Sequence, residues 1–171
     1  KLFITKEIFH FDALRPKLQA ELVGLGEFDE KEPQHYMFLD LGHSTYTVCI
    51  AAFVKGKLSI KSVRYDRNLG GRDFDMKIAE HYAAQHKEKT GDDVMSNHKA
   101  AIKMLAGAEK SKKDISPKGV TSSTCNVECL MNDRDFSGRM SLDEFETMCE
   151  PFIARLEARA VAPGPAQLLE L

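Results

Sequence analysis

The feature that most constrains the fold is an abrupt change of hydrophobic period at Gly70-Gly71. Before it, three apolar and β-branched runs, at 36–39, 46–54 and 58–65, are separated by short turns. Such runs predict three strands, and because the turns between them are short, the strands must pair as an antiparallel meander. The middle run is apolar at consecutive positions, so we expect it in the centre of a sheet that is covered on both faces.

Beyond the diglycine the apolar side chains change to a helical spacing. Phe74, Ile78 and Tyr82 recur every four residues, which predicts a helix over residues 72–89. The same analysis predicts a helix over 97–115, a strand over 125–131, a further turn or strand over 133–140, and a helix that begins at a capping box formed by Ser141 and Glu144. This mixture indicates a chain of the α/β class.

Charge and hydropathy exclude several classes of function. Among 171 residues, 24 are Lys or Arg and 26 are Asp or Glu, so the chain lacks the basic excess typical of nucleic-acid binding. Its longest apolar run, residues 48–54, is far shorter than the roughly 20 residues that cross a bilayer. The first residues reach Glu7 before any long apolar run, so we expect no secretory signal. We therefore expect neither nucleic acid nor a membrane as a partner.

The cysteines and histidines do not form a recognisable metal or disulfide pattern. No C-x-x-C pair is present, and Cys125 and Cys129 lie on a predicted strand. Four strand residues span about 13 Å, whereas a disulfide requires Cα atoms within about 7 Å. We expect reduced thiols, and hence a cytoplasmic or nuclear protein. His81 and His86 lie five apart on a predicted helix, on different faces, which argues against a shared metal.

Residues 133–144 fit the ligand pattern of an EF-hand calcium loop. Oxygen-bearing side chains occupy loop positions 1, 3, 5, 9 and 12, and Gly138 occupies position 6. However, the preceding residues 121–132 have strand character instead of the amphipathic helix that an EF-hand needs, and no second loop is present. A hairpin turn followed by a capped helix fits better, and a calcium-binding module remains the alternative.

A second candidate site is the turn after the first predicted strand. Asp40 ends that strand, and Gly42 and the hydroxyl residues Ser44 and Thr45 follow. Backbone amides in such a turn can converge on a phosphate oxygen, and Asp40 could hold a magnesium ion through water. The lysine of a P-loop is missing, so an ordinary hairpin is the competing interpretation.

The third candidate is the diglycine Gly70-Gly71 itself, which leads into a helix N-terminus. Free amides at that end favour an anion, although the glycines also suit a simple hinge between strand and helix.

Five sequence blocks, taken in order, resemble the nucleotide-binding domain of the heat shock protein 70 superfamily, and more closely its heat shock protein 110 branch. The blocks are FLDLGHSTY at 38–46, AFVKGKL at 52–58, LGGRDFD at 69–75, AEKSKK at 108–113 and VECLMND at 127–133.

The resemblance implies an actin-like ATPase fold of the ribonuclease H-like kind, of which this chain looks like a fragment of lobe II. It would combine an antiparallel β-meander with an α+β outer subdomain. The implied divisions are an N-terminal segment and linker at 1–34, the lobe II base at 35–69, the outer subdomain at 70–158 and a tail at 159–171.

The same resemblance assigns nucleotide-binding roles by position. The second phosphate loop, which approaches the phosphates of ATP, corresponds to Asp40, Gly42, His43, Ser44 and Thr45, with Asp40 also near the metal. The phosphate-side hinge corresponds to Gly70 and Gly71. The residues that would hold the adenosine are Glu109, Lys112, Lys113 and Ser116, with long stems stacked on the base and polar tips near the ribose.

The chain also departs from the hydrolysing branch of the family. His43 and Ser44 replace two glycines, and Thr47 stands where that branch has an acid. An acid there would orient the attacking water or its metal, so the resemblance implies ATP binding with weak or no hydrolysis. Ser111 and Asp114 replace residues of the adenosine helix that are usually apolar.

The implied function is that of a cytoplasmic heat shock protein 110-type chaperone. It would bind ATP and Mg²⁺, act as a nucleotide exchange factor for a 70-kDa heat shock chaperone, and hold unfolded protein clients. An ATP-hydrolysing chaperone of the parent branch, a calcium module and a fragment without nucleotide function are the alternatives. For the isolated chain we expect little or no ATP affinity, because the family's other lobe supplies half of the ligands.

Overall fold

The computed structural model describes residues 2–5 and 31–161, and most of the predicted N-terminal segment and tail therefore lies outside the described residues. The chain divides into two compact units, one of Lys1–Gly71 with Arg155–Leu171 and one of Arg72–Ala154, and each is described by itself. In the described parts of the chain, no helix has the length and apolar character needed to cross a membrane.

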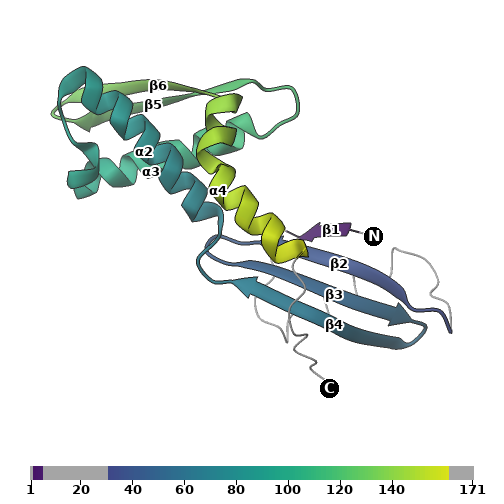
Figure 1. Cartoon of the computed structure of the whole chain (residues 1–171). Helices are drawn as coiled ribbons and strands as arrows, with labels where there is room; N and C mark the ends of the chain where they lie inside the picture. Colours follow the sequence, from purple (N-terminus) through teal and green to yellow (C-terminus); the bar gives the residue numbers. More distant parts are fainter. Residues whose placement is uncertain (1, 6–30, 162–171) are drawn as a thin grey trace. The chain divides into compact units, whose positions relative to one another are not determined.

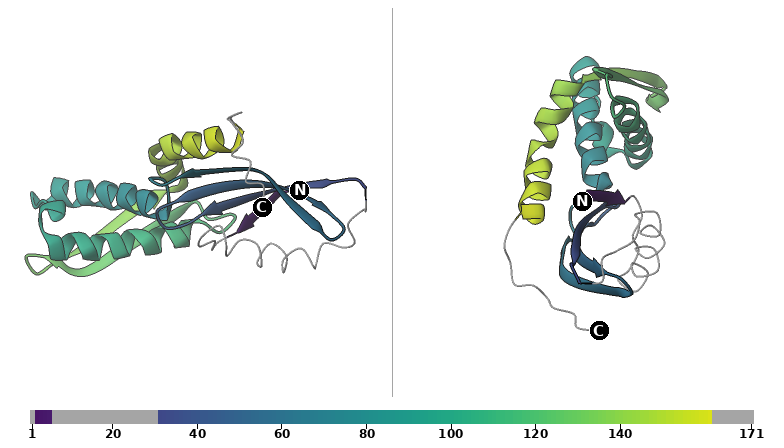
Figure 2. Two further views of the ribbon diagram at one scale, coloured as in Figure 1. Left: turned by 90° about the horizontal axis from the view of Figure 1, so that it is seen from below. Right: turned by 90° about the vertical axis from the view of Figure 1, so that its right-hand side faces the viewer.

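Unit 1 is built on a four-stranded sheet in the order β1-β2-β3-β4 (Figure 1). The strands are β1 (Leu2–Thr5), β2 (Gln34–Leu41), β3 (Tyr46–Val54) and β4 (Lys57–Asp66). The predicted antiparallel meander is confirmed for β2, β3 and β4, with β3 in the middle. Gly56, with a φ of 75°, makes the tight turn between β3 and β4. Figure 2 shows the twist of this sheet along its edge.

One strand of this sheet was not predicted. β1 pairs with β2 in parallel, from Leu2 opposite Met37 to Thr5 opposite Asp40. The core face of the sheet buries Tyr36, Phe38 and Phe53, whose rings meet edge to face at centroid distances of 5.4 and 6.4 Å. This packing fixes the register of β2 against β3, since a slip of one residue would move the rings to the other face.

Unit 2 contains most of the helices and a β-hairpin. Its elements are α2 (Gly71–Thr90), a short 3₁₀ helix η2 (Val94–Ser96), α3 (His98–Ile115), β5 (Ser122–Met131), β6 (Arg134–Ser141) and α4 (Leu142–Val161), of which α2 and α4 extend into unit 1 at one end. The predicted helix ends are confirmed where caps define them: Asn97 accepts from the Ala100 amide before α3, and Gly91, with φ 80°, follows α2.

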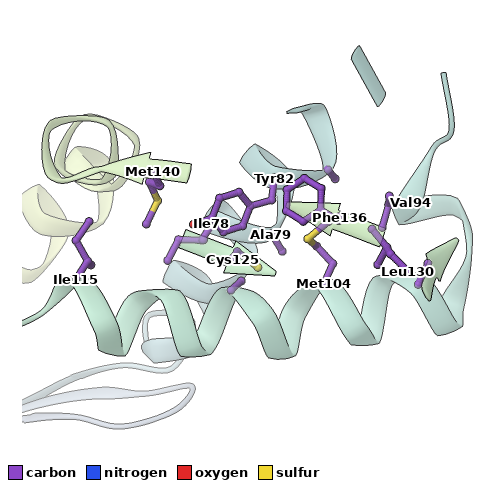
Figure 3. Close-up of a cluster of buried hydrophobic side chains, with 13 residues drawn as sticks. Ile78, Ala79, Tyr82, Val94, Met104, Ile115, Cys125, Leu130, Phe136 and Met140 are labelled. Carbon is purple, nitrogen blue, oxygen red and sulfur yellow. The ribbon is translucent and has the colours of Figure 1, made fainter. Parts of the chain in front are cut away.

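The core of unit 2 lies between α2, α3 and the β5–β6 hairpin. Tyr82 and Phe136 pack with ring centroids 5.6 Å apart, and Met104 of α3 lies next to them (Figure 3). Gly107 allows α3 to approach β5 closely, because a Cβ there would lie 2.6 Å from Cys125 Sγ. Burial of these side chains holds α2 and α3 on the hairpin.

Candidate functional site

The predicted phosphate-binding turn is a four-residue loop that joins β2 to β3. β2 ends at Leu41, β3 begins at Tyr46, and these two residues pair directly. Inside the loop the Gly42 amide donates a 2.9 Å hydrogen bond to the Thr45 carbonyl, and a Cβ at Gly42 would lie only 3.3 Å from that oxygen. The loop is therefore compact, and a side chain at Gly42 would press on its backbone.

The loop is fastened to the diglycine turn. The Gly71 amide donates a 2.8 Å hydrogen bond to the Gly42 carbonyl. A Cβ at Gly70 would lie 2.5 Å from the Ser44 nitrogen, and it would also overlap the His43 carbonyl group. No side chain fits at Gly70, so only glycine lets the two backbone segments approach this closely. The second and third candidate sites thus form one structure within unit 1.

Asp40 lies at the base of this loop. It is 5% exposed and stands opposite Thr47 in the register of β2 and β3. A buried carboxylate next to a loop that carries two hydroxyl groups offers hard oxygen donors, which suit a magnesium ion that keeps part of its water shell. The chemistry of these donors is compatible with Mg²⁺.

The four residues predicted to hold adenosine form one stripe on α3, the α3 stripe. Glu109, Lys112, Lys113 and Ser116 follow one another at helical spacings of three, one and three, and so share a face of the helix at its C-terminal end. The Ser116 hydroxyl donates to the Lys112 carbonyl at 2.6 Å and caps the helix. The α3 stripe belongs to unit 2.

Both lysines of the α3 stripe are ion-paired. Lys113 Nζ lies 2.7 Å from Glu109 Oε1, and the hydrogen bond and charge of Glu109 raise the pKa of Lys113. Lys112 Nζ lies 2.6 Å from Asp75 Oδ1 of α2. The first pair is exposed and the second is mostly buried, which gives the two lysines different freedom of movement.

Ser111 stands where the family's adenosine helix usually has an apolar residue. Its hydroxyl is buried but has two hydrogen-bond partners. Its Oγ lies 2.5 Å from the Tyr82 hydroxyl and 2.6 Å from Ser123 Oγ. The three hydroxyls form a chain that links α2, α3 and β5, and burial raises the pKa of Tyr82. Asp114, the second unusual residue, is exposed, so neither substitution disrupts the packing of α3.

Comparison with known proteins identifies the family. The model of the Hsp70 protein family matches residues 22–162, which is most of the chain. The chain belongs to the Hsp70 family. The predicted resemblance to its heat shock protein 110 branch is confirmed, and the family's nucleotide-binding domain has the actin-like ATPase fold.

Three relatives illustrate the match. The chain is 44% identical over 127 residues to a heat shock protein homolog of Lachancea kluyveri, which covers 74% of this chain and 18% of that protein. It is 41% identical over 128 residues to "97 kDa heat shock protein" of Strongylocentrotus purpuratus, covering 75% and 14%. It is 39% identical over 131 residues to "Heat shock 70 kDa protein 14" of Arabidopsis thaliana, covering 77% and 16%. This Hsp70-family chain therefore spans less than a fifth of each of these relatives.

The calcium-loop alternative is wrong. Residues Arg134–Ser141 form the extended strand β6, so the proposed ligands are spread along a strand instead of converging on one point. Glu144, the last proposed ligand, accepts hydrogen bonds from the Ser141 amide at 2.7 Å and the Ser141 hydroxyl at 2.9 Å, and its own amide donates to Ser141 Oγ. This is the predicted capping box, which also lowers the pKa of Glu144.

The two histidines of α2 lie in different surroundings. His86 is buried edge-to-face against Phe136, whereas His81 Nε2 lies 2.8 Å from Gln85 Nε2. Over residues 31–160, no three His, Cys, Asp or Glu side chains gather as a metal site would require. All four cysteines are free, as predicted.

Sequence reasoning missed the role of Asp75 and the partners of Ser111. A signal for both was present, because each polar residue lies on the apolar stripe of its helix. Asp75 shares a face of α2 with Ala79 and Tyr82, and Ser111 shares a face of α3 with Met104 and Ala108. A polar side chain on such a face must find a partner in the core.

Proposed function

We propose that this chain is part of lobe II of the nucleotide-binding domain of a heat shock protein 110-type chaperone. Residues 35–69 would form the base of the lobe and residues 70–158 its outer subdomain. The observation that carries the proposal is the fastening of the 42–45 loop to the diglycine turn, with the buried Asp40 beside it. We name this compact backbone, residues 42–45 with Gly70 and Gly71, the cradle, and in the proposal it is where phosphate oxygens would bind.

In the whole protein, the cradle and Asp40 would hold the phosphates of ATP and its Mg²⁺, and the α3 stripe would hold the adenosine. The metal would supply charge neutralisation of the phosphates. Thr47, opposite Asp40, carries a hydroxyl that cannot accept a proton from water at neutral pH as a carboxylate would. We therefore propose that ATP is bound and hydrolysed slowly or not at all, and serves as a conformational ligand.

The biological role that follows is nucleotide exchange on a 70-kDa heat shock chaperone in the cytoplasm, together with retention of unfolded clients. The relatives' names support a heat shock protein of the Hsp70 family, and the exchange role and the location are our proposal. The test is the release of a fluorescent ADP from the 70-kDa chaperone, measured with and without the full-length parent protein. ATP-dependent acceleration is expected, and an unchanged release rate would contradict the exchange role.

The ATP-hydrolysing chaperone is the second candidate, favoured by the intact Gly70-Gly71 turn and Asp40. A steady-state ATPase assay on the full-length parent protein separates the two. Rapid turnover would favour the hydrolysing chaperone, whereas a rate near background supports ATP as a bound ligand. The isolated 171-residue chain should bind ATP more weakly than the micromolar range in a fluorescent nucleotide titration.

A further inference from the structure

Two arginines near the C-terminal end of α4 converge on one buried carboxylate of unit 1. Arg155 Nη2 donates a 2.9 Å hydrogen bond to Asp66 Oδ2, and Arg159 Nε lies 3.8 Å from the same oxygen. The arginines are four residues apart and so share a face of α4. Asp66 is 9% exposed and ends β4. The carboxylate therefore ties the last turns of α4 to the end of β4, and all three residues belong to unit 1.

Asp66 and Arg155 together hold the turn that leads to the diglycine. Asp66 Oδ1 accepts a 3.0 Å hydrogen bond from the Asn68 amide, and Arg155 Nη2 also donates to the Asn68 carbonyl at 3.1 Å. The peptide groups on both sides of Asn68 are therefore fixed. Only the buried residue Leu69 separates Asn68 from Gly70. The contacts at Asn68 thus determine where the diglycine begins.

The cradle tolerates little displacement of this turn. A Cβ at Gly70 would lie 2.5 Å from the Ser44 nitrogen, so the two backbone segments are already in contact. The Gly71 amide donates to the Gly42 carbonyl at 2.8 Å. An N–H···O contact beyond about 3.5 Å is no longer a hydrogen bond, so a shift of less than about 1 Å would separate the loop from the diglycine.

Arg155 is not placed to touch a phosphate on the Asp40 side of the sheet. Asp40 pairs with Thr47, and Thr47 pairs with Tyr65. Asp66 is the next residue of β4, and successive strand residues point to opposite faces of a sheet. Asp66 and the arginine that it holds therefore lie on the face opposite Asp40.

From this geometry we infer that Arg155 is a positioning residue of the cradle. It acts through the Asn68 turn, from the face of the sheet opposite Asp40, and sets the approach of the diglycine to the 42–45 loop. The inference rests on the proposed function where it concerns phosphate binding, whereas the positioning of the backbone can be measured without a ligand.

The first experiment measures amide hydrogen exchange in the 171-residue chain by NMR. The test variants are Arg155→Met, which removes the guanidinium, and Arg155→Lys, which keeps the charge. The matched control is Arg159→Met, because Arg159 lies on the same face of α4 and near the same carboxylate but beyond hydrogen-bond distance of it. The reporters are the amides of Asn68, Gly71 and Gly42, which bind within the turn and the cradle.

Arg155→Met should speed exchange of these three amides by about three- to tenfold, the effect of losing one partly exposed, charge-assisted hydrogen bond. Arg155→Lys should restore part of the protection, and Arg159→Met should change it by less than about twofold. Amides in the middle of β3 report general opening of the sheet and should be unchanged. Equal acceleration in β3, or an equal effect of Arg159→Met, would overturn the positioning role.

The second experiment titrates the full-length parent protein and the same variants with ATP and with adenosine. Arg155→Met should weaken ATP binding by about three- to tenfold, because a displaced cradle must be reordered on binding. Adenosine has no phosphate for the cradle to hold, so its affinity should not change, whereas a general loss of structure would weaken both ligands. Equal weakening of both, or unchanged ATP affinity, would refute the role in phosphate binding.

The two experiments separate this inference from the proposed function. A native parent protein that does not bind ATP would overturn the proposed nucleotide function and the phosphate part of the inference. The exchange measurement would still decide whether Arg155 positions the 42–45 loop, because it requires no nucleotide.

Discussion

The buried hydroxyl chain allows a quantitative prediction about how unit 2 is stabilised. Ser111→Ala removes both hydrogen bonds of the chain and leaves the hydroxyls of Tyr82 and Ser123 without that partner. A net hydrogen bond contributes about 1 kcal/mol, and an unsatisfied buried hydroxyl costs about 1–3 kcal/mol. We therefore expect Ser111→Ala to lower the free energy of unfolding by about 3 kcal/mol.

The second arm of the prediction is a double-mutant cycle. Tyr82→Phe breaks one bond while Ser111 keeps Ser123 as its partner, so it should cost about 1.5 kcal/mol. In the Ser111→Ala background the same change removes a hydroxyl that has already lost its Ser111 partner, and the double variant should cost about 3 kcal/mol instead of the sum of about 4.5. The expected coupling is therefore about 1.5 kcal/mol.

The assay is urea unfolding of the 171-residue chain, followed by far-UV circular dichroism, since nearly all of α2 and all of α3 belong to unit 2. Hydrogen exchange of the α3 amides provides a local measure of the same quantity. Ser137→Ala, at an exposed hydroxyl that donates to Asn126, is the control and should change stability by less than about 0.5 kcal/mol. Additive effects of Ser111→Ala and Tyr82→Phe would refute the coupled chain.

Three further predictions concern unit 1 and the contact of α3 with β5 in unit 2. Gly70→Ala forces a Cβ into the backbone of the 42–45 loop and should speed hydrogen exchange of the loop amides. Unchanged protection of these amides from exchange would contradict the close approach of Gly70 to the loop. The backbone amide of Asn68 and the guanidinium of Arg155 hold the pKa of Asp66 below its ordinary value. This stabilisation should be present above pH about 4 and be lost as the pH falls below it. When the free energy of unfolding is measured against pH, the Asp66→Asn variant should lose less stability on acidification than the native chain does. A Cβ at Gly107 would lie 2.6 Å from Cys125 Sγ, so Gly107→Ala must displace that side chain. It should lower the free energy of unfolding, measured with urea, by about 1–3 kcal/mol.

Local sequence patterns predicted the elements that local physics determines. The meander, the helices α2 and α3 and the capping box of α4 all follow from periodicity and capping chemistry. β1 could not be predicted in the same way, because a parallel partner is reached through a long connection and no short turn marks the pair. The pairing of β5 with β6 shifts register between Val127 and Met131, and Cys129 there has a φ of 45°. This irregularity was also not predicted, and the Cys129 amide donates across the hairpin to Asp135.

The candidate site shows the same limit. The phosphate loop and the diglycine were each visible in the sequence, but their hydrogen bond depends on where the end of β4 brings Gly71. The distances between backbone segments, and hence the need for glycine at position 70, are consequences of the sheet. The family resemblance supplied the grouping that spacing alone could not.

The polar residues of the unit 2 core have a common consequence. Apolar contacts between helices tolerate small slides and rotations, because their energy depends weakly on direction. The ion pair of Asp75 with Lys112 and the hydroxyl bonds of Ser111 are directional, and both anchor α3 to α2 within one helical turn of the α3 stripe. Directional contacts on a helix specify its rotation about its own axis as well as its distance from the neighbouring helix. The polar residues of this core therefore define the rotation of α3 against α2.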